Sequence, residues 1–192
     1  MSAKILVFAG SMRDGSFNIK LADALTNALI ELGAEVTHVC AKNYQLPIFN
    51  EDLEVPEKAI ALAKLFEQSD GFVFVSPEYN ASVTPLMKNT LDWVSVSGVS
   101  SSNSFGPYKD KMCFISSCSP GKTGGLRGLY HLRAILMNVG AEIITPQLSV
   151  GEGETAFDAD GKLKDPHLVS LMDKGLDELL FTIQRIKAVP RP

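Results

Sequence analysis

The sequence predicts an α/β fold built on a parallel, doubly wound sheet. Three observations support this prediction: short apolar runs alternate with helical patterns, Pro and Gly mark the ends of those patterns, and polar loops follow two of the runs. Strand–helix alternation gives parallel strands joined by right-handed crossovers, which place every loop that leaves a strand at one rim of the sheet. We therefore expect that rim to carry the function.

The apolar runs of strand length define the predicted sheet. They lie at residues 4–9, 35–39, 71–76, 111–116 and 142–144. Continuous apolar runs are typical of parallel strands that are buried on both faces. Five strands favour a flavodoxin-like three-layer arrangement with the strand order 2-1-3-4-5, in which the ligand lies beside the first and third strands.

Helical patterns occupy the intervals between these runs. In the first pattern, Leu21 to Leu32 keep a 3.6-residue period and Gly33 ends the helix. The others are residues 59–66, a helix opened by Pro85, residues 126–139 ended by Gly140, and a helix opened by Pro166.

The length of 192 residues fits one domain, residues 1–192, with enough chain for a full core. We find no internal repeat and no domain linker. Two connections are long for a compact domain, residues 95–110 and 151–164, and such loops are often lids or binding loops.

Composition excludes several classes of partner and location. A net charge of −4 gives no electrostatic footprint for nucleic acid or for an anionic membrane surface. No apolar stretch approaches the length of a membrane span, and the N-terminus lacks a signal-peptide pattern. Cys40, Cys113 and Cys118 are sparse and odd in number, which fits a reducing cytoplasm better than a disulfide framework.

The loop after the first apolar run carries the strongest functional signal. It contains Ser11, Arg13 and Ser16 and ends at Asn18, where the first helix is predicted to begin. Main-chain N–H groups at a helix N-terminus favour an anion, and hydroxyl, amide and guanidinium groups add donors that suit a phosphate. Ser16 or Asn18 alone is also explained as a helix N-cap. Arg13 exceeds what a cap requires, so we interpret the loop as a cradle for a monophosphate.

A second polar loop, Ser76-Pro77-Glu78-Tyr79-Asn80, follows the third apolar run. Pro and Asn by themselves indicate a turn. The continuation through Ser82 adds specificity, because such a loop can present main-chain N–H and C=O groups to a heteroaromatic ring. Together with the first loop it describes one ligand crevice.

A third loop, residues 116–125, follows the fourth run. Its Gly121-Lys122-Thr123 looks like the end of a nucleoside-triphosphate P-loop, but that motif requires a glycine where Ser116 stands. The loop is either a strand-to-helix turn or a small-residue wall for the edge of a flat ligand, and composition leaves both interpretations open.

Other site chemistry is not indicated. His38, His131 and His167 have no metal-ligand spacing relative to one another or to the cysteines. The chain has no Gly-x-Ser-x-Gly elbow, and no Ser/His/Asp arrangement can be argued. We therefore predict no metal site and name no catalytic side chain.

In combination, the motifs resemble the NADPH-dependent FMN reductase family, which includes bacterial quinone and chromate reductases and azoreductase-like enzymes. The motifs are Gly10-Ser11-x-Arg13-x-x-Ser16-x-Asn18, Pro77-Glu78-Tyr79-Asn80-x-Ser82 and Lys88-Asn89-x-x-Asp92-Trp93. Two more, Ser119-Pro120-Gly121-x-x-Gly124-Gly125 and Phe157-Asp158-x-Asp160-Gly161-x-Leu163-x-Asp165-Pro166, are similar to one subgroup of the family. The resemblance extends over essentially the whole chain.

The resemblance implies a flavodoxin-like fold that binds FMN without a covalent bond. It assigns the FMN phosphate to the side chains of Ser11, Arg13, Ser16 and Asn18 and to the main chain of Phe17. It assigns one side of the isoalloxazine ring to Pro77, Glu78, Tyr79 and Asn80, and the other edge to Ser117 and Ser119.

The resemblance also implies a reaction and an assembly. Hydride passes from NADPH or NADH to the flavin, and two electrons then pass to a small-molecule acceptor in a ping-pong scheme. The acceptor is a quinone, an azo compound, a metal oxyanion or free flavin. An N–H donor from the Tyr79–Asn80 region near the flavin N5 or O4 would help to hold the reduced ring. Family members are commonly dimers or tetramers, so we expect a homodimer or homotetramer.

Two other classes of function are weighed against this one. A flavodoxin-type electron carrier would lack a nicotinamide site and would carry an acidic docking surface, whereas a net charge of −4 is mild. A flavin-binding regulatory protein would bind FMN but show little turnover.

One segment departs from the family pattern. Residues 95–110 form a longer connection than the short Pro-rich link that is usual there. We expect this segment to alter access to the pocket, the subunit interface, or both.

Overall fold

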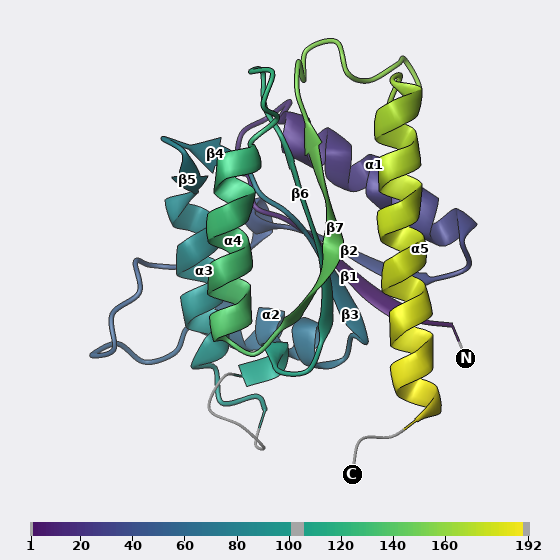
Figure 1. Cartoon of the computed structure of the whole chain (residues 1–192). Helices are drawn as coiled ribbons and strands as arrows, with labels where there is room; N and C mark the ends of the chain where they lie inside the picture. Colours follow the sequence, from purple (N-terminus) through teal and green to yellow (C-terminus); the bar gives the residue numbers. More distant parts are fainter. Residues whose placement is uncertain (1, 101–105, 190–192) are drawn as a thin grey trace.

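The computed structural model describes residues 2–100 and 106–189, and strands and helices alternate along them as expected (Figure 1). The strands of the main sheet are β1 (Lys4–Ala9), β2 (Glu35–Cys40), β3 (Gly71–Val75), β6 (Met112–Cys118) and β7 (Glu142–Val150). The helices are α1 (Phe17–Glu31), α2 (Glu57–Glu67), α3 (Pro85–Ser95), α4 (Leu126–Asn138) and α5 (Pro166–Ala188). Short 3-10 turns lie at Ala41–Asn43 and Gly106–Tyr108.

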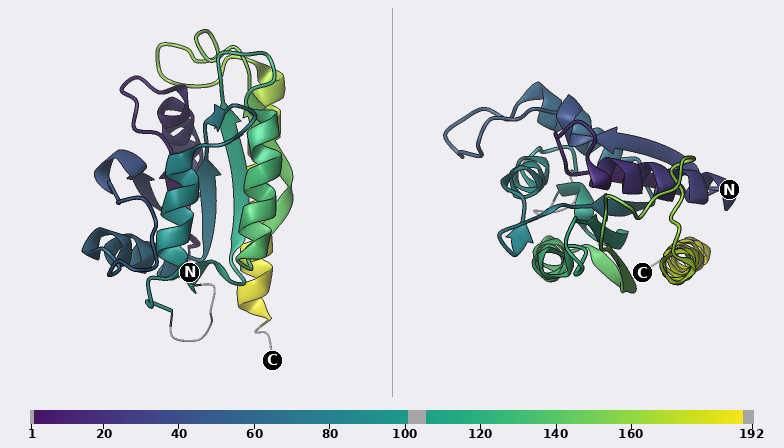
Figure 2. Two further views of the ribbon diagram at one scale, coloured as in Figure 1. Left: turned by 90° about the vertical axis from the view of Figure 1, so that its left-hand side faces the viewer. Right: turned by 90° about the horizontal axis from the view of Figure 1, so that it is seen from above.

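The sheet topology confirms the predicted fold class. The strands pair in parallel in the order β2-β1-β3-β6-β7, which is the order 2-1-3-4-5 when the main-sheet strands are counted along the chain. Seen from above, α1 and α5 lie on one side of the sheet and α3 and α4 on the other (Figure 2). Because β1, β3 and β6 are parallel, the loops that follow them lie at the same rim of the sheet.

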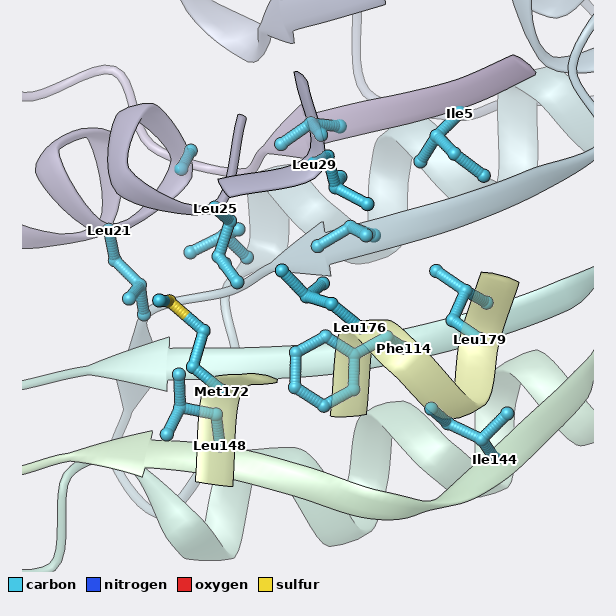
Figure 3. Packing of buried hydrophobic residues seen from close by; sticks show 14 of the residues in the cluster. Ile5, Leu21, Leu25, Leu29, Phe114, Ile144, Leu148, Met172, Leu176 and Leu179 are labelled. Atoms are coloured by element: carbon cyan, nitrogen blue, oxygen red, sulfur yellow. The ribbon is translucent and has the colours of Figure 1, made fainter. Parts of the chain in front are cut away.

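Two apolar cores form because side chains alternate between the faces of each buried strand. In β1, Ile5 and Val7 pack toward α1 and α5, whereas Leu6 and Phe8 pack toward α2, α3 and α4. Figure 3 shows the first core, where leucines of α1 and α5 meet the ring of Phe114 from β6. The two cores hold the strands rigidly and so fix the positions of the loops at the rim.

Two features extend beyond the predicted elements. A small hairpin, β4 (Glu78–Tyr79) and β5 (Ser82–Val83), replaces the simple loop expected after β3. The last sheet strand, β7, continues to Val150 rather than ending at residue 144. A register shift between its pairings with Cys113 and Ile115 accommodates Pro146, so pairing resumes after the proline.

No helix within the described ranges combines the length and the apolar character that crossing a membrane requires.

Candidate functional site

The carboxyl ends of β1, β3 and β6 border a cleft of about 330 Å³, a volume within the range of small-molecule sites. The residues that line it are Ser11, Arg13, Ser16, Phe17, Asn18, Pro77, Glu78, Tyr79, Cys118, Ser119, Pro120 and Glu154. Nine of the eleven residues predicted for the site are in this lining, and Asn80 and Ser117 are not. Cys118, Pro120 and Glu154 were not predicted, and Glu154 had no motif to indicate it.

The loop between β1 and α1 presents hydrogen-bond donors toward this cleft. The Gly10 N–H donates to the Val75 carbonyl at 2.8 Å, which joins the ends of β1 and β3. Ser16 caps α1 by accepting from the Asn18 N–H at 3.2 Å, and Ser11 Oγ accepts from the Arg13 N–H at 3.4 Å. Because both hydroxyls accept from the main chain, each keeps its own proton to donate.

The start of α1 adds positive potential to these donors. Within the described part of the chain, the Phe17 N–H, the first of the helix, has no hydrogen-bond acceptor. Unpaired N–H groups and the helix dipole both favour an anion at this position. The Arg13 guanidinium lies 5.2 Å from the centre of the Phe17 ring, a cation–π contact that holds the positive charge at the mouth of the cleft.

Asn18 joins two distant elements. Its Nδ2 donates to the Cys118 carbonyl at 2.7 Å, and the Cys118 N–H donates to its Oδ1 at 2.9 Å. This pair of bonds fastens the start of α1 to the end of β6 and forms the floor of the cleft. The Asn18 side chain therefore bonds to main-chain groups of Cys118, which the loop motif alone did not indicate. Only its second Nδ2 proton is left to donate to a ligand.

The hairpin after β3 forms a second wall with a strained turn. Asn80 and Ala81 have φ values of 50° and 64°, in the left-handed region that non-glycine residues rarely adopt. Such backbone strain concentrates at binding and catalytic sites. Tyr79 precedes the turn, lines the cleft and is 54% exposed as a residue.

The carboxylate of Glu78 accepts hydrogen bonds from α4. Oε1 accepts from Arg127 Nη2 at 2.8 Å and from Nε at 3.1 Å, and Oε2 accepts from the Gly128 N–H at 2.9 Å. Burial alone would raise the pKa of this carboxyl, but the hydrogen bonds from Gly128 and Arg127 together hold the pKa below its ordinary value. Glu78 therefore links the hairpin to α4 through charged hydrogen bonds.

The third loop, residues 116–125, contributes Ser119 to the lining of the cleft, whereas Ser117 is not part of the lining. Ser117 is fully buried, and its hydroxyl has no hydrogen-bond partner. A Cβ on Gly125 would lie 2.0 Å from that oxygen, and Gly125 has a φ of 84°, so the loop requires glycine there. The interpretation of this loop as a small-residue wall is consistent with that packing.

Two of the three cysteines are deeply buried in β6. Burial raises the pKa of the Cys118 thiol to about 12 and that of Cys113 further, so neither forms a reactive thiolate at neutral pH. The described residues contain no group of three His, Cys, Asp or Glu side chains arranged to hold a metal ion.

The long connection between α3 and β6 does not border the cleft where it is described. Residues 95–100 follow the carboxyl end of α3, and residues 106–110 lead to the amino end of β6, so both lie at the opposite rim of the sheet (Figure 1). None of these described residues lines the cleft. Residues 101–105 lie outside the described part of the chain.

A three-layer α/β fold with hydrogen-bond donors gathered at the switch point beside β1 and β3 is typical of the flavodoxin-like, mononucleotide-binding class of protein. Within that class, residues 3–155 match the family model described as NADPH-dependent FMN reductase, and the chain belongs to this family.

Curated relatives agree with the family. An NAD(P)H-dependent FMN reductase of Pseudomonas aeruginosa is 29% identical over 188 residues, which cover 96% of this chain and 97% of the relative. A quinone reductase of Escherichia coli is 30% identical over 190 residues, with the same coverage of the two chains.

Among solved structures, FerB, a flavoenzyme NAD(P)H:(acceptor) oxidoreductase from Paracoccus denitrificans, superposes with a TM-score of 0.81. The two sequences are 25% identical, and the match covers 95% of this chain and 98% of FerB.

Proposed function

We propose that the loop between β1 and α1 holds the phosphate of FMN and that the hairpin after β3 holds its ring. As a member of the family, the chain is an FMN-dependent NAD(P)H oxidoreductase. The observation that carries the site assignment is the set of free donors at the start of α1. Two buried serine hydroxyls, an unpaired N–H and a guanidinium converge there, which suits a phosphate dianion.

The residues present divide the work of binding. Ser11, Ser16 and the Phe17 N–H neutralise the phosphate, and Arg13 closes over it from the solvent side. Pro77 and Tyr79, which line the cleft, offer main-chain groups to the ring, and the strained turn at Asn80 follows directly after them. FMN held there would supply the redox chemistry between NAD(P)H and the acceptor, while these residues bind and orient it. No side chain is required as acid or base, and we assign none.

We propose a quinone as the acceptor, because relatives matched over 84% and 96% of this chain are an NAD(P)H:quinone oxidoreductase and a quinone reductase. Azo compounds, metal oxyanions and free flavin remain alternative acceptors. We also propose a homodimer or homotetramer in the cytoplasm. The free thiols of Cys40, Cys113 and Cys118 support a reducing compartment. Sedimentation that finds only a 20.8 kDa species at micromolar concentration would exclude the oligomer.

The test is an anaerobic visible spectrum of the purified protein reconstituted with FMN, before and after NADPH and then a quinone. Bleaching by NADPH followed by recovery with the quinone is expected. Bound flavin that NADPH leaves oxidised would indicate a flavodoxin-type carrier or a regulatory protein. Absence of flavin binding would show that the loop after β1 holds a different phosphate.

Arg13→Ala tests the placement of the phosphate. Loss of a hydrogen bond from a charged group costs about 1.5–3 kcal/mol, so FMN affinity should fall roughly 10- to 100-fold. Arg13→Lys should recover part of the affinity because it keeps the charge without the planar fork. Full affinity in Arg13→Ala would refute the placement.

A further inference from the structure

The hairpin after β3 is held in place by α4. Glu78, at its first strand, is bonded to Arg127 and to the Gly128 N–H. Ser82, at its second strand, lies 2.9 Å from His131 Nδ1 through its Oγ. Arg127 and His131 are four residues apart, so they present their side chains from successive turns of one helix face.

The hairpin depends on these contacts because it has little support of its own. Each of its strands is two residues long, and the only paired positions are Glu78 with Val83 and Tyr79 with Ser82 within the described chain. A two-stranded hairpin is at best marginally stable alone. The left-handed Asn80 and Ala81 add strain that the surroundings must offset.

α4 packs closely enough against the hairpin to restrain its two strands. A Cβ on Gly128 would lie 3.2 Å from Glu78 Cβ and 3.2 Å from the Ser82 carbonyl oxygen, so the helix backbone lies directly against both strands. The Glu78 side chain is only 8% exposed, whereas Arg127 reaches it from the surface with 63% of its side chain exposed, so the carboxylate is fixed by packing as well as by charge.

We propose that Arg127 and His131 are positioning residues for the flavin ring. They hold Glu78 and Ser82, and through them the strained Tyr79–Ala81 turn, in the geometry that meets the isoalloxazine. This inference rests on the proposed function. Because the phosphate cradle lies on the other loop, loosening the hairpin changes the surroundings of the ring while most of the FMN affinity is retained.

The experiment compares Arg127→Met, Arg127→Lys and His131→Asn with the wild type. Arg185→Met, at an exposed arginine of α5, is the matched control. The first measurement is amide hydrogen exchange of residues 78–83 in the protein without FMN. Arg127→Met should exchange at least tenfold faster there, His131→Asn less so, and Arg127→Lys should recover part of the protection.

The second measurement uses FMN-loaded protein and includes readouts besides activity. Visible circular dichroism of the bound flavin should change in Arg127→Met, and kcat should fall several-fold while the FMN dissociation constant changes less than threefold. Arg185→Met should match the wild type throughout.

The outcomes separate the two proposals. Unchanged exchange of residues 78–83 together with an unchanged flavin spectrum in Arg127→Met and His131→Asn would overturn the positioning role. A fall in FMN affinity as large as that of Arg13→Ala would also overturn it, because the hairpin would then act in phosphate binding. A wild-type protein that binds no FMN would instead refute the proposed function, whereas the exchange measurement would still report the restraint of the hairpin.

Discussion

The loop after β1 and the hairpin after β3 face the same cleft but are held in different ways. The loop has bonds among its own residues, from Ser16 to Arg13 and Asn18 and from Ser11 to Arg13, besides its bonds to Val75 and Cys118. The hairpin is ordered by α4, which begins some 50 positions later, through Glu78 with Arg127 and Ser82 with His131. Donors that a loop carries in its own sequence can be recognised from that sequence, whereas its contacts with distant elements cannot.

The largest effect is expected from Ser16→Asp, which separates the two roles of Ser16 in the loop. Aspartate retains the helix cap, and because Ser16 is buried, the larger charged side chain should lower the free energy of unfolding by about 1–3 kcal/mol. A carboxylate beside the phosphate costs several kcal/mol, so FMN affinity should fall roughly 100-fold or more. Chemical denaturation and a flavin titration measure the two quantities. Retained affinity would show that the phosphate lies elsewhere.

The second prediction concerns the long-range contact made by the loop. Asn18→Ala leaves the N–H and the carbonyl of Cys118 buried without partners, and each unpaired group costs about 1–3 kcal/mol. The free energy of unfolding should fall by about 2–4 kcal/mol in urea. Asn27→Ala, at an exposed position of the same helix, is the control and should have a small effect. Equal effects of the two variants would contradict the role of Asn18 in joining the start of α1 to the end of β6.

The third prediction tests the hairpin through pH. The pKa of Glu78 is lowered in the folded state, so its contribution to stability is present above the ordinary carboxyl pKa of about 4.3 and is lost as pH falls through the lower folded value. Glu78→Gln should reduce the free energy of unfolding at pH 7 by about 1 kcal/mol. The difference from wild type should shrink below about pH 4. A constant difference across that range would exclude the charge as the cause.

The smallest effect is expected from Cys118→Ala. This change leaves the main-chain bonds to Asn18 in place and removes only a thiol whose raised pKa keeps it protonated. FMN affinity and NADPH-dependent quinone reduction should stay within about twofold of the wild type. A large loss of turnover would reveal a thiol step that the buried position argues against.

The strands, helices and first loop could be predicted because their signals are local. The period of Leu21 to Leu32 with Gly33 after it marked α1, and Pro85 and Pro166 marked the starts of α3 and α5. The end of β7 was missed because Thr145-Pro146 looks like a strand end. Only pairing with β6 across a register shift shows that the strand continues.

The hairpin and its partners could not be predicted for a related reason. A two-residue hairpin turn is normally indicated by Asn-Gly, and here the left-handed pair is Asn80 and Ala81. Glu78 was assigned to the ring by resemblance, yet its carboxylate bonds to Arg127, a residue that no motif connected to it. Contacts between residues so far apart depend on the fold, which the sequence pattern specifies only as a class.

The tie between Asn18 and Cys118 also sets an order of events during synthesis of the protein. The cradle sequence leaves the ribosome 100 residues before the strand that supplies its floor. Until β6 has been made and has docked beside β3, the nascent chain has a phosphate loop with an open end. The complete cleft can therefore form only after residue 118 has been synthesised and β6 has paired with β3.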